Sequence, residues 1–155
     1  MCNTRVVVIS GYFNPLHTGH LDYIKDASKL GDKLVVIINN DEQVDLKGST
    51  PFMKEVDRMR IISAIKGVDR VVLSIDTDSS VVQTISLIYN EYAVNWDFDT
   101  MTFANGGDRT IESSPEESYC NWRKIRTVYS VGGNKTQSSS GLIDNATKNV
   151  DKDKE

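Results

Sequence analysis

The chain has few cysteines and no long apolar run, and these shortages exclude several classes of protein. Its 155 residues include two cysteines, Cys2 and Cys120, which lie far apart and have no further Cys or His at the spacing of metal ligands. We therefore expect neither a disulfide scaffold nor a zinc site, and we expect a reducing, cytoplasmic location. Every apolar run is far shorter than the roughly 20 residues of a membrane span, so no membrane partner is expected.

The chain also lacks an excess of positive charge. Eighteen Lys and Arg against 22 Asp and Glu give a formal net charge of −4 at pH 7. A general nucleic-acid binder needs many surplus cations to displace counterions from phosphates, so no nucleic-acid partner is expected. Any phosphate site must instead be local, and it must be built from a few placed cations and backbone N–H groups.

What the sequence does contain is a regular alternation of apolar runs with amphipathic segments. Unbroken β-branched runs, such as the one from Val6 to Ile9, indicate strands that are buried on both faces of a parallel sheet. Apolar residues at helical spacing, such as Leu21 and Ile24, indicate helices. The expected strands are residues 6–9, 33–39, 70–75, 101–105 and 126–131, the expected helices are residues 20–30, 55–66, 79–92, 114–122 and 138–147, and residues 40–54 are expected to form a loop.

This order predicts an α/β fold with a five-stranded parallel sheet, right-handed crossovers and helices on both faces. We expect a single domain over residues 1–147 and a polar, disordered tail over residues 148–155. Such sheets bind ligands beyond the carboxyl ends of their strands, where the strand order reverses. The unusual residues of this chain lie in the loops that follow the first, second, fourth and fifth expected strands.

The loop after the first expected strand, residues 11–20, carries the strongest functional signal. The chain has only two histidines, His17 and His20, and both lie here, at the start of a helix that Thr18 can cap. A helix N-terminus attracts anions, and two imidazoles add hydrogen-bond donors aimed at one anion. Phosphoryl or nucleotidyl transfer needs such donors around a phosphorus whose oxygens gain charge. Two alternatives are ordinary surface histidines and a zinc site, for which the sequence offers no completing cluster.

The residues of this loop read GYFNPLHTGH, which resembles the H-x-G-H signature of the cytidylyltransferase-like nucleotidylyltransferase superfamily. The likeness continues through the blocks LGDKLVVIIN, LKGSTPF, DRMRIISAIKGVDRVV, NGGDR and KTQSSSGLI. The chain is most similar to the heptose-1-phosphate adenylyltransferase domain and to glycerol-3-phosphate cytidylyltransferase. The resemblance implies a Rossmann-like sheet and an enzyme of the nucleotidyltransferase class.

The resemblance also assigns roles to particular residues. It implies that His17, His20 and Lys47 are catalytic, with the lysine acting on the phosphates of the nucleotide or the acceptor. No residue is expected to bind a metal directly. The implied nucleotide-binding residues are Gly11, Tyr12, Phe13, Asn14, Gly19, Arg58, Gly106, Gly107, Asp108, Lys135, Ser138, Ser139 and Ser140.

Each assignment has a structural alternative that the sequence leaves open. Lys47 also fits a solvated loop lysine, and Arg60 competes with Arg58 for the role at the second expected helix. The Gly-Gly-Asp block fits a plain turn, the three serines fit a helix N-cap, and the aromatic residues of the first loop fit core packing.

The implied mechanism is a direct in-line transfer. An oxygen of a small phosphorylated acceptor attacks the α-phosphorus of CTP or ATP, CMP or AMP is transferred, and pyrophosphate leaves. His17 and His20 would stabilise the reacting phosphorus, and backbone N–H groups near Tyr12 and Phe13 would hold the triphosphate. Mg²⁺ would bridge the phosphates and keep several waters, because the motifs offer no carboxylate cage.

Two rival functions and one structural question stay open. Residues 141–144 read GLID, where relatives carry a Lys or Arg, and this departure favours a nucleotide-binding regulatory protein that has lost the chemistry. An aminoacyl-adenylate-forming domain shares the H-x-G-H element, but the chain is short for a synthetase. The aromatic residues of segment 90–100 fit either a homodimer surface or the core.

Overall fold

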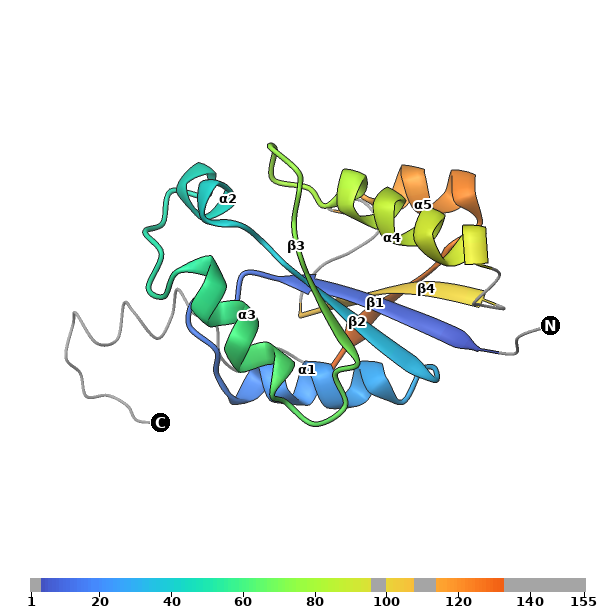
Figure 1. Cartoon of the computed structure of the whole chain (residues 1–155), viewed down its shortest axis with the longest axis horizontal. Coiled ribbons are helices and arrows are strands. Elements are labelled where there is room, and N and C mark those ends of the chain that lie inside the picture. The colour runs from blue at the N-terminus through green and yellow to red at the C-terminus, as the bar shows by residue number, and fades with distance from the viewer. Residues whose placement is uncertain (1–3, 96–99, 108–113, 133–155) are drawn as a thin grey trace.

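The computed structural model describes residues 4–95, 100–107 and 114–132, and these residues form a five-stranded sheet with helices packed on it (Figure 1). All strand pairs are parallel, and the strand order is β3-β2-β1-β4-β5. The predicted α/β fold is therefore confirmed. The strands are β1 (Arg5–Gly11), β2 (Lys33–Ile38), β3 (Arg70–Leu73), β4 (Thr100–Gly106) and β5 (Arg126–Val131), and the helices are α1 (Thr18–Ser28), α2 (Asp41–Leu46), α3 (Glu55–Ser63), α4 (Val82–Asn95) and α5 (Glu117–Arg123).

Helices cover both faces of the sheet, and this explains the unbroken apolar strands. Helices α1 and α3 pack on one face, and α4 and α5 pack on the other (Figure 1). Along β1, Val6 and Val8 belong to the α4/α5 side of the core, whereas Val7 and Ile9 belong to the α1/α3 side. Successive side chains of a strand point to opposite faces, so a strand covered on both faces needs apolar residues at every position.

The strand order places the switch point of the sheet between β1 and β4. From β1 the chain proceeds outward through β2 to β3, and then crosses back to β4 and β5 on the other side. The loops that follow β1 and β4 therefore leave neighbouring strands at the carboxyl edge, which is where such sheets bind ligands. The loop of residues 11–20, which we call the histidine loop, leaves the end of β1, and the Gly106-Gly107 turn leaves the end of β4.

The predicted loop over residues 40–54 is wrong in part, because α2 occupies its first half. The side chain of Asn40 accepts the backbone N–H of Gln43 at 2.8 Å, and Oε1 of Gln43 accepts the backbone N–H of Asn40 at 3.0 Å. This capping box starts a six-residue helix in which only Gln43 and Val44 are buried. So short a helix has too few apolar residues to show helical periodicity, although the N-x-x-Q spacing could have indicated it. The expected helix over residues 138–147 lies outside the described residues.

The segment at the end of α4 is only partly described. Tyr92 is half-buried and packs against the core on the α4/α5 side, which favours core packing over an exposed surface for this residue. Residues 96–99, with Trp96 and Phe98, lie outside the described residues.

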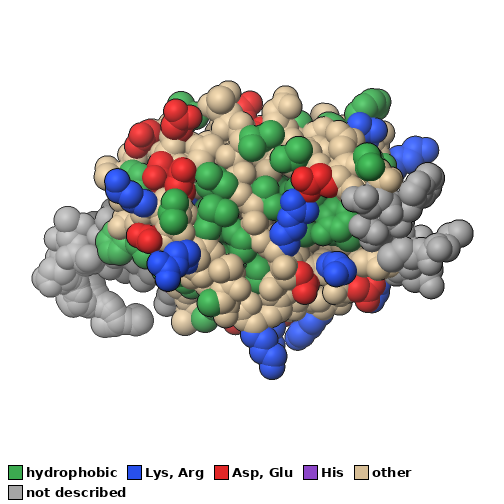
Figure 2. All heavy atoms as spheres, viewed as in Figure 1, with side chains coloured by type: hydrophobic (Ala, Val, Ile, Leu, Met, Phe, Trp, Pro, Cys, Tyr) green, Lys and Arg blue, Asp and Glu red, His purple; other side chains and the backbone are tan. Residues whose placement is uncertain are grey.

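The described surface carries charges of both signs. On the face shown in Figure 2, Lys and Arg side chains lie among Asp and Glu side chains, with apolar side chains between them. Among the described residues, we find no helix that is long and apolar enough to cross a membrane.

Cys120 on α5 is a buried free thiol, and it gives a prediction about reactivity. Burial and, to a lesser extent, the charges of Glu116 and Glu117 together raise the pKa of this thiol from its usual 9.0 to about 12. Because the thiolate is the reactive form, the folded Cys2→Ser variant should not react with a disulfide reagent at mildly alkaline pH. The thiol should react once guanidinium unfolds the chain, and rapid labelling of the native variant would contradict the prediction.

The same shift makes stability depend on pH. The folded state holds the Cys120 proton more tightly than the unfolded chain, so the contribution of this group is complete below its usual pKa of 9.0. That contribution is lost as the pH rises from 9.0 toward about 12. A Cys120→Ala variant should lose this part of the alkaline decline in the free energy of unfolding.

Candidate functional site

His17 and His20 cap α1 in a reciprocal arrangement. Nδ1 of His17 accepts the backbone N–H of Gly19 at 3.1 Å, and Nδ1 of His20 accepts the backbone N–H of His17 at 3.1 Å. The predicted cap, Thr18, is instead the first residue of the helix. His17 takes the cap because its backbone is extended, with φ −142° and ψ 178°, and its ring nitrogen reaches the second helical N–H.

This capping determines which nitrogen of each ring carries the proton. A nitrogen that accepts an N–H must present its lone pair, so the neutral imidazoles of His17 and His20 carry their protons on Nε2. The two rings stack, with centroids 3.8 Å apart and planes inclined by 21°. The start of α1 therefore holds two adjacent imidazoles in the same tautomer, each able to donate from Nε2.

Phe13 packs edge-on against His20, with ring centroids 4.8 Å apart. Its side chain is buried in the core on the α1/α3 side, although its backbone has a φ of +49°. A Cβ on Gly11 would lie 2.7 Å from the Phe13 ring, so residue 11 must be glycine for this ring to fit. The Phe13 side chain packs in the core and supports His20, which is the core-packing alternative for this residue, and its role in nucleotide binding stays a prediction.

Two further predicted glycines lie against protein side chains. A Cβ on Gly19 would come within 2.9 Å of the His17 ring, and a Cβ on Gly106 would come within 2.9 Å of the Tyr23 ring. Tyr23 donates its hydroxyl to the carbonyl of Ala104 at 2.6 Å, which fixes the ring at the end of β4. In the described structure, the absence of a Cβ at these glycines leaves room for these rings. Their expected contact with a ligand stays a prediction.

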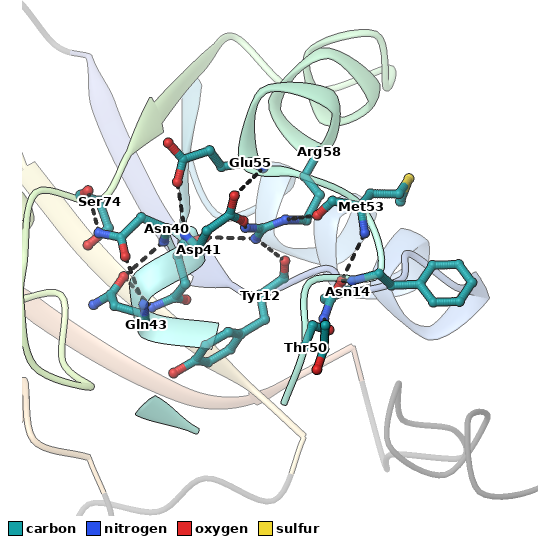
Figure 3. Close-up of polar contacts among 12 residues, drawn as sticks. Tyr12, Asn14, Asn40, Asp41, Gln43, Thr50, Met53, Glu55, Arg58 and Ser74 are labelled. Carbon is teal, nitrogen blue, oxygen red and sulfur yellow. Dashed lines mark hydrogen bonds and ion pairs between the residues drawn. The ribbon is translucent and has the colours of Figure 1, made fainter. Parts of the chain in front are cut away.

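Asn14 ties the histidine loop to the segment between α2 and α3 (Figure 3). Its Nδ2 donates to the carbonyl of Thr50 at 3.1 Å, and its Oδ1 accepts the backbone N–H groups of Phe52 at 2.5 Å and Met53 at 3.3 Å. The residue is 5% exposed. The structure therefore shows Asn14, predicted to bind nucleotide, holding the backbone of residues 50–53.

Arg58 is the buried centre of the same region (Figure 3). Its Nε donates to the carbonyl of Met53 at 3.0 Å, and its Nη1 donates to the carbonyls of Tyr12 and Asn39, both at 2.7 Å. Its Nη2 forms an ion pair with Asp41 at 2.7 Å. The guanidinium thus joins the ends of β1 and β2 to the starts of α2 and α3.

These contacts give Arg58 a structural role that the sequence did not predict. Its side chain is 0% exposed, and its donors point to three carbonyls and one carboxylate of the chain. We conclude that Arg58, from its buried position, holds in place the backbone segments that surround the site. Arg60, the competing arginine, is exposed, as expected for a surface charge.

Lys47 ends α2 and lies close to the histidine loop. Its ammonium is 4.3 Å from the centroid of the Tyr12 ring, and its backbone N–H donates to the carbonyl of Gln43 at 3.1 Å. The side chain is exposed, and Gly48 then turns the chain with a φ of +85°. The structure therefore brings the predicted lysine beside the histidine loop, at the carboxyl edge of the sheet.

The remaining predicted residues are only partly described. Gly106 is the last residue of β4, and Gly107 follows it. Because β4 is the neighbour of β1, their turn and the histidine loop leave the sheet from adjacent strands. The others, Asp108, Lys135, Ser138, Ser139 and Ser140, lie outside the described residues.

A buried polar cluster between α2 and the loop after β3 was not predicted from the sequence. Gln43 is fully buried, and its Nε2 donates to the carbonyls of Asp78 at 2.7 Å and Ser80 at 2.8 Å. Nδ2 of Asn40 donates to the carbonyls of Ser74 at 3.0 Å and Asp76 at 3.1 Å. The cluster attaches α2 to the loop after β3. Only the capping spacing signalled it, because the partners of Asn40 and Gln43 in the loop after β3 are distant backbone carbonyls.

The charged groups of this region support local structure. Hydrogen bonds from the hydroxyl and backbone N–H of Ser80 hold the pKa of Asp78 below its ordinary value. Within the described part of the chain, no three His, Cys, Asp or Glu side chains gather as they would to hold a metal ion.

Comparison with known proteins gives consistent similarities. A model of the cytidylyltransferase-like family matches residues 8–150. An FAD synthase of Thermoplasma volcanium is 40% identical over 72 residues, which are 46% of this chain and 51% of that protein. The bifunctional protein HldE of Koribacter versatilis is 46% identical over 71 residues, 44% of this chain and 15% of that protein. The match thus spans about half of the FAD synthase and a small part of HldE.

One solved structure extends the similarity to the fold. The crystal structure of the lipopolysaccharide core biosynthesis protein from Thermoplasma volcanium GSS1 superposes with a TM-score of 0.59 at 28% sequence identity. The superposition covers 82% of this chain and 96% of that protein.

Proposed function

The chain belongs to the cytidylyltransferase-like family, and from this premise we propose that it is a nucleotidylyltransferase. It transfers AMP or CMP from ATP or CTP to a small phosphorylated acceptor and releases pyrophosphate. The observation that carries the proposal is the stacked pair of His17 and His20 at the N-terminus of α1. Their capping bonds leave Nε2 as the donor of each neutral ring, which suits an anionic reaction centre.

The proposed reaction is a direct displacement at the α-phosphorus. An oxygen of the acceptor phosphate forms a bond to this phosphorus, and the bond to the bridging oxygen of pyrophosphate breaks. His17 and His20 donate from Nε2 to the phosphoryl oxygens, whose charge rises in the transition state. Lys47 supports the phosphates of the nucleotide or the acceptor, and the backbone N–H groups of Tyr12 and Phe13 hold the triphosphate. Neither histidine forms a covalent bond.

We propose that the nucleotide binds as its Mg²⁺ complex. The described residues offer no cluster of carboxylates around the histidine pair, so phosphate oxygens and water are the natural ligands of the ion. The bound ion would neutralise part of the charge of the leaving pyrophosphate.

The names of the relatives suggest two classes of acceptor, and the assay should cover both. HldE suggests a sugar phosphate, and FAD synthase suggests a flavin phosphate. We propose to measure thermal shifts with ATP, CTP, GTP and UTP in the presence of Mg²⁺. Pyrophosphate release would then be assayed with heptose-1-phosphate, glycerol-3-phosphate and riboflavin phosphate, and the products identified by mass.

The expected result is stabilisation by ATP or CTP and pyrophosphate release with one acceptor class. Nucleotide binding without pyrophosphate release from any acceptor would overturn the proposal in favour of a regulatory nucleotide-binding protein. Absence of nucleotide binding would overturn both functions.

A Gly19→Ala variant should separate activity from stability. The added Cβ would lie 2.9 Å from the His17 ring, which must move. We expect kcat to fall by about 10- to 100-fold, because small displacements of catalytic groups are costly. Alanine is the better helix former, so the free energy of unfolding should change by less than about 1 kcal/mol. Steady-state kinetics measure the first effect and urea unfolding measures the second. A Thr18→Ala variant, at the exposed neighbouring position, is the control. A normal kcat in Gly19→Ala would contradict the prediction.

A further inference from the structure

Tyr12 and Lys47 meet across the candidate site although they come from different parts of the chain. Tyr12 follows β1 in the histidine loop, and Lys47 is the C-cap of α2. The lysine ammonium lies over the ring, 4.3 Å from its centroid, which is a cation–π distance. The contact therefore joins the loop of the two histidines to the segment that follows β2.

The backbone on both sides of this contact is held in place. The carbonyl of Tyr12 accepts Nη1 of the buried Arg58 at 2.7 Å, and the ring extends away from that guanidinium (Figure 3). On the other side, the backbone N–H of Lys47 donates to the carbonyl of Gln43, whose own side chain fastens α2 to the loop after β3. The Tyr12 ring itself lies against the long side chain of Lys47.

An aromatic face suits the task of restraining that side chain. A lysine has four flexible carbons and a point-like charge, and an exposed one samples many rotamers. The ring attracts the ammonium through its quadrupole and covers one side of it. Because an ammonium has three N–H donors, the sides away from the ring can still donate to phosphate oxygens. The α2 C-terminus, with its partial negative charge, also favours the cation there.

We propose that Tyr12 is a positioning residue, whose ring holds the Lys47 ammonium at the histidine loop before the phosphates arrive. The inference rests on the proposed function, since it takes Lys47 to act on phosphates, and it adds the residue that presents the lysine. Tyr12 acts through Lys47 in this proposal and does not itself touch the reacting atoms.

The test uses inorganic tripolyphosphate as the probe, because this anion has neither a base nor an acceptor. Its affinity would be measured by calorimetry at low salt for the wild type, Tyr12→Phe, Tyr12→Leu, Lys47→Met and the Tyr12→Leu/Lys47→Met double variant. We expect Tyr12→Phe to bind more tightly than Tyr12→Leu, because the aromatic face is kept. Tyr12→Leu should bind about two- to fivefold more weakly, the factor that corresponds to an exposed cation–π contact.

The double variant decides whether the effect passes through Lys47. Tyr12→Leu should have no further effect when Lys47 is already methionine. An equal loss in both backgrounds, or a loss in Tyr12→Phe as large as in Tyr12→Leu, would overturn the proposal. An unchanged affinity in Tyr12→Leu would overturn it as well.

A second measurement needs no variant that could fail to fold. In the wild type, the methylene protons of Lys47 nearest the ammonium should show upfield ring-current shifts in NMR spectra, and random-coil shifts would refute the contact. This readout also separates the two hypotheses. A protein with the shifted lysine but no pyrophosphate release would lose the proposed function and keep the Tyr12–Lys47 contact.

Discussion

Replacing His17 or His20 with alanine should lower kcat for pyrophosphate release by about 10²–10³-fold, with a modest change in nucleotide affinity. Each ring, in the proposed mechanism, donates from Nε2 to oxygens that gain charge only as the transition state forms. Loss of one such donor typically costs about 2.7–4 kcal/mol of transition-state stabilisation. A loss confined to kcat indicates an interaction made in the transition state, so kcat and KM should be measured separately.

The capping role of the histidines complicates an alanine substitution, and a matched pair of variants resolves it. His17→Ala also removes the acceptor for the backbone N–H of Gly19, a cap whose loss costs about 1 kcal/mol of stability. Asparagine places an amide oxygen near the position of Nδ1 and is a good N-cap, but it cannot reach the position of Nε2. His17→Asn should therefore keep the stability of the wild type and lose the activity.

Glutamine makes the complementary change, because its amide N–H can approach the Nε2 position. His17→Gln should retain more activity than His17→Asn. The double variant that lacks both histidines should lose less transition-state stabilisation than the sum of the losses in the two single variants, since the stacked rings act on one phosphorus. Near-normal turnover of His17→Asn would rule out the proposed role of this ring.

Replacing Arg58 with alanine should destabilise the fold by about 3–5 kcal/mol, which is the usual cost of breaking a buried ion pair. The change removes the partner of Asp41 and leaves the carbonyls of Tyr12, Asn39 and Met53 without their donor. Denaturant unfolding measures this loss directly. Because Nη1 of Arg58 also donates to the carbonyl of Tyr12, the histidine loop should lose one of its attachments as well.

Two variants on the same helix sharpen the test of Arg58. Arg58→Lys keeps the charge but cannot span four acceptors, so it should recover only part of the lost stability. Arg60→Ala removes an exposed arginine and should stay within about 0.5 kcal/mol of the wild type. If Arg58→Lys were as stable as the wild type, the fork of hydrogen bonds would not be what holds this region together.

Residues that act locally could be predicted from the sequence. The strands were predicted because a parallel strand covered on both faces must be apolar throughout, as in Val6 to Ile9. The position of the histidine pair was also predictable, because the helical spacing of Leu21 and Ile24 places the start of a helix at these residues. The identity of the cap was not, since an imidazole is a rarer cap than the neighbouring threonine.

Residues that act over long distances could not be assigned in this way. Arg58 and Asn14 were both expected to bind nucleotide, yet each bonds to backbone groups of segments far away in the chain. Hydrogen bonds to backbone carbonyls and N–H groups leave no pattern in the side chains of the partners. The likeness to a family identified these positions as important but did not distinguish a ligand contact from a structural one.

The sequence by itself thus determined the parallel α/β sheet and the placement of two histidines at the start of α1, because periodicity and capping act within a strand or a turn. Only the tertiary structure decided that Arg58 and Asn14 support the site from inside, and that Lys47 lies over Tyr12. These outcomes depend on which strand ends are neighbours at the carboxyl edge. That neighbourhood follows from the strand order, which brings residues distant in the chain within hydrogen-bond reach.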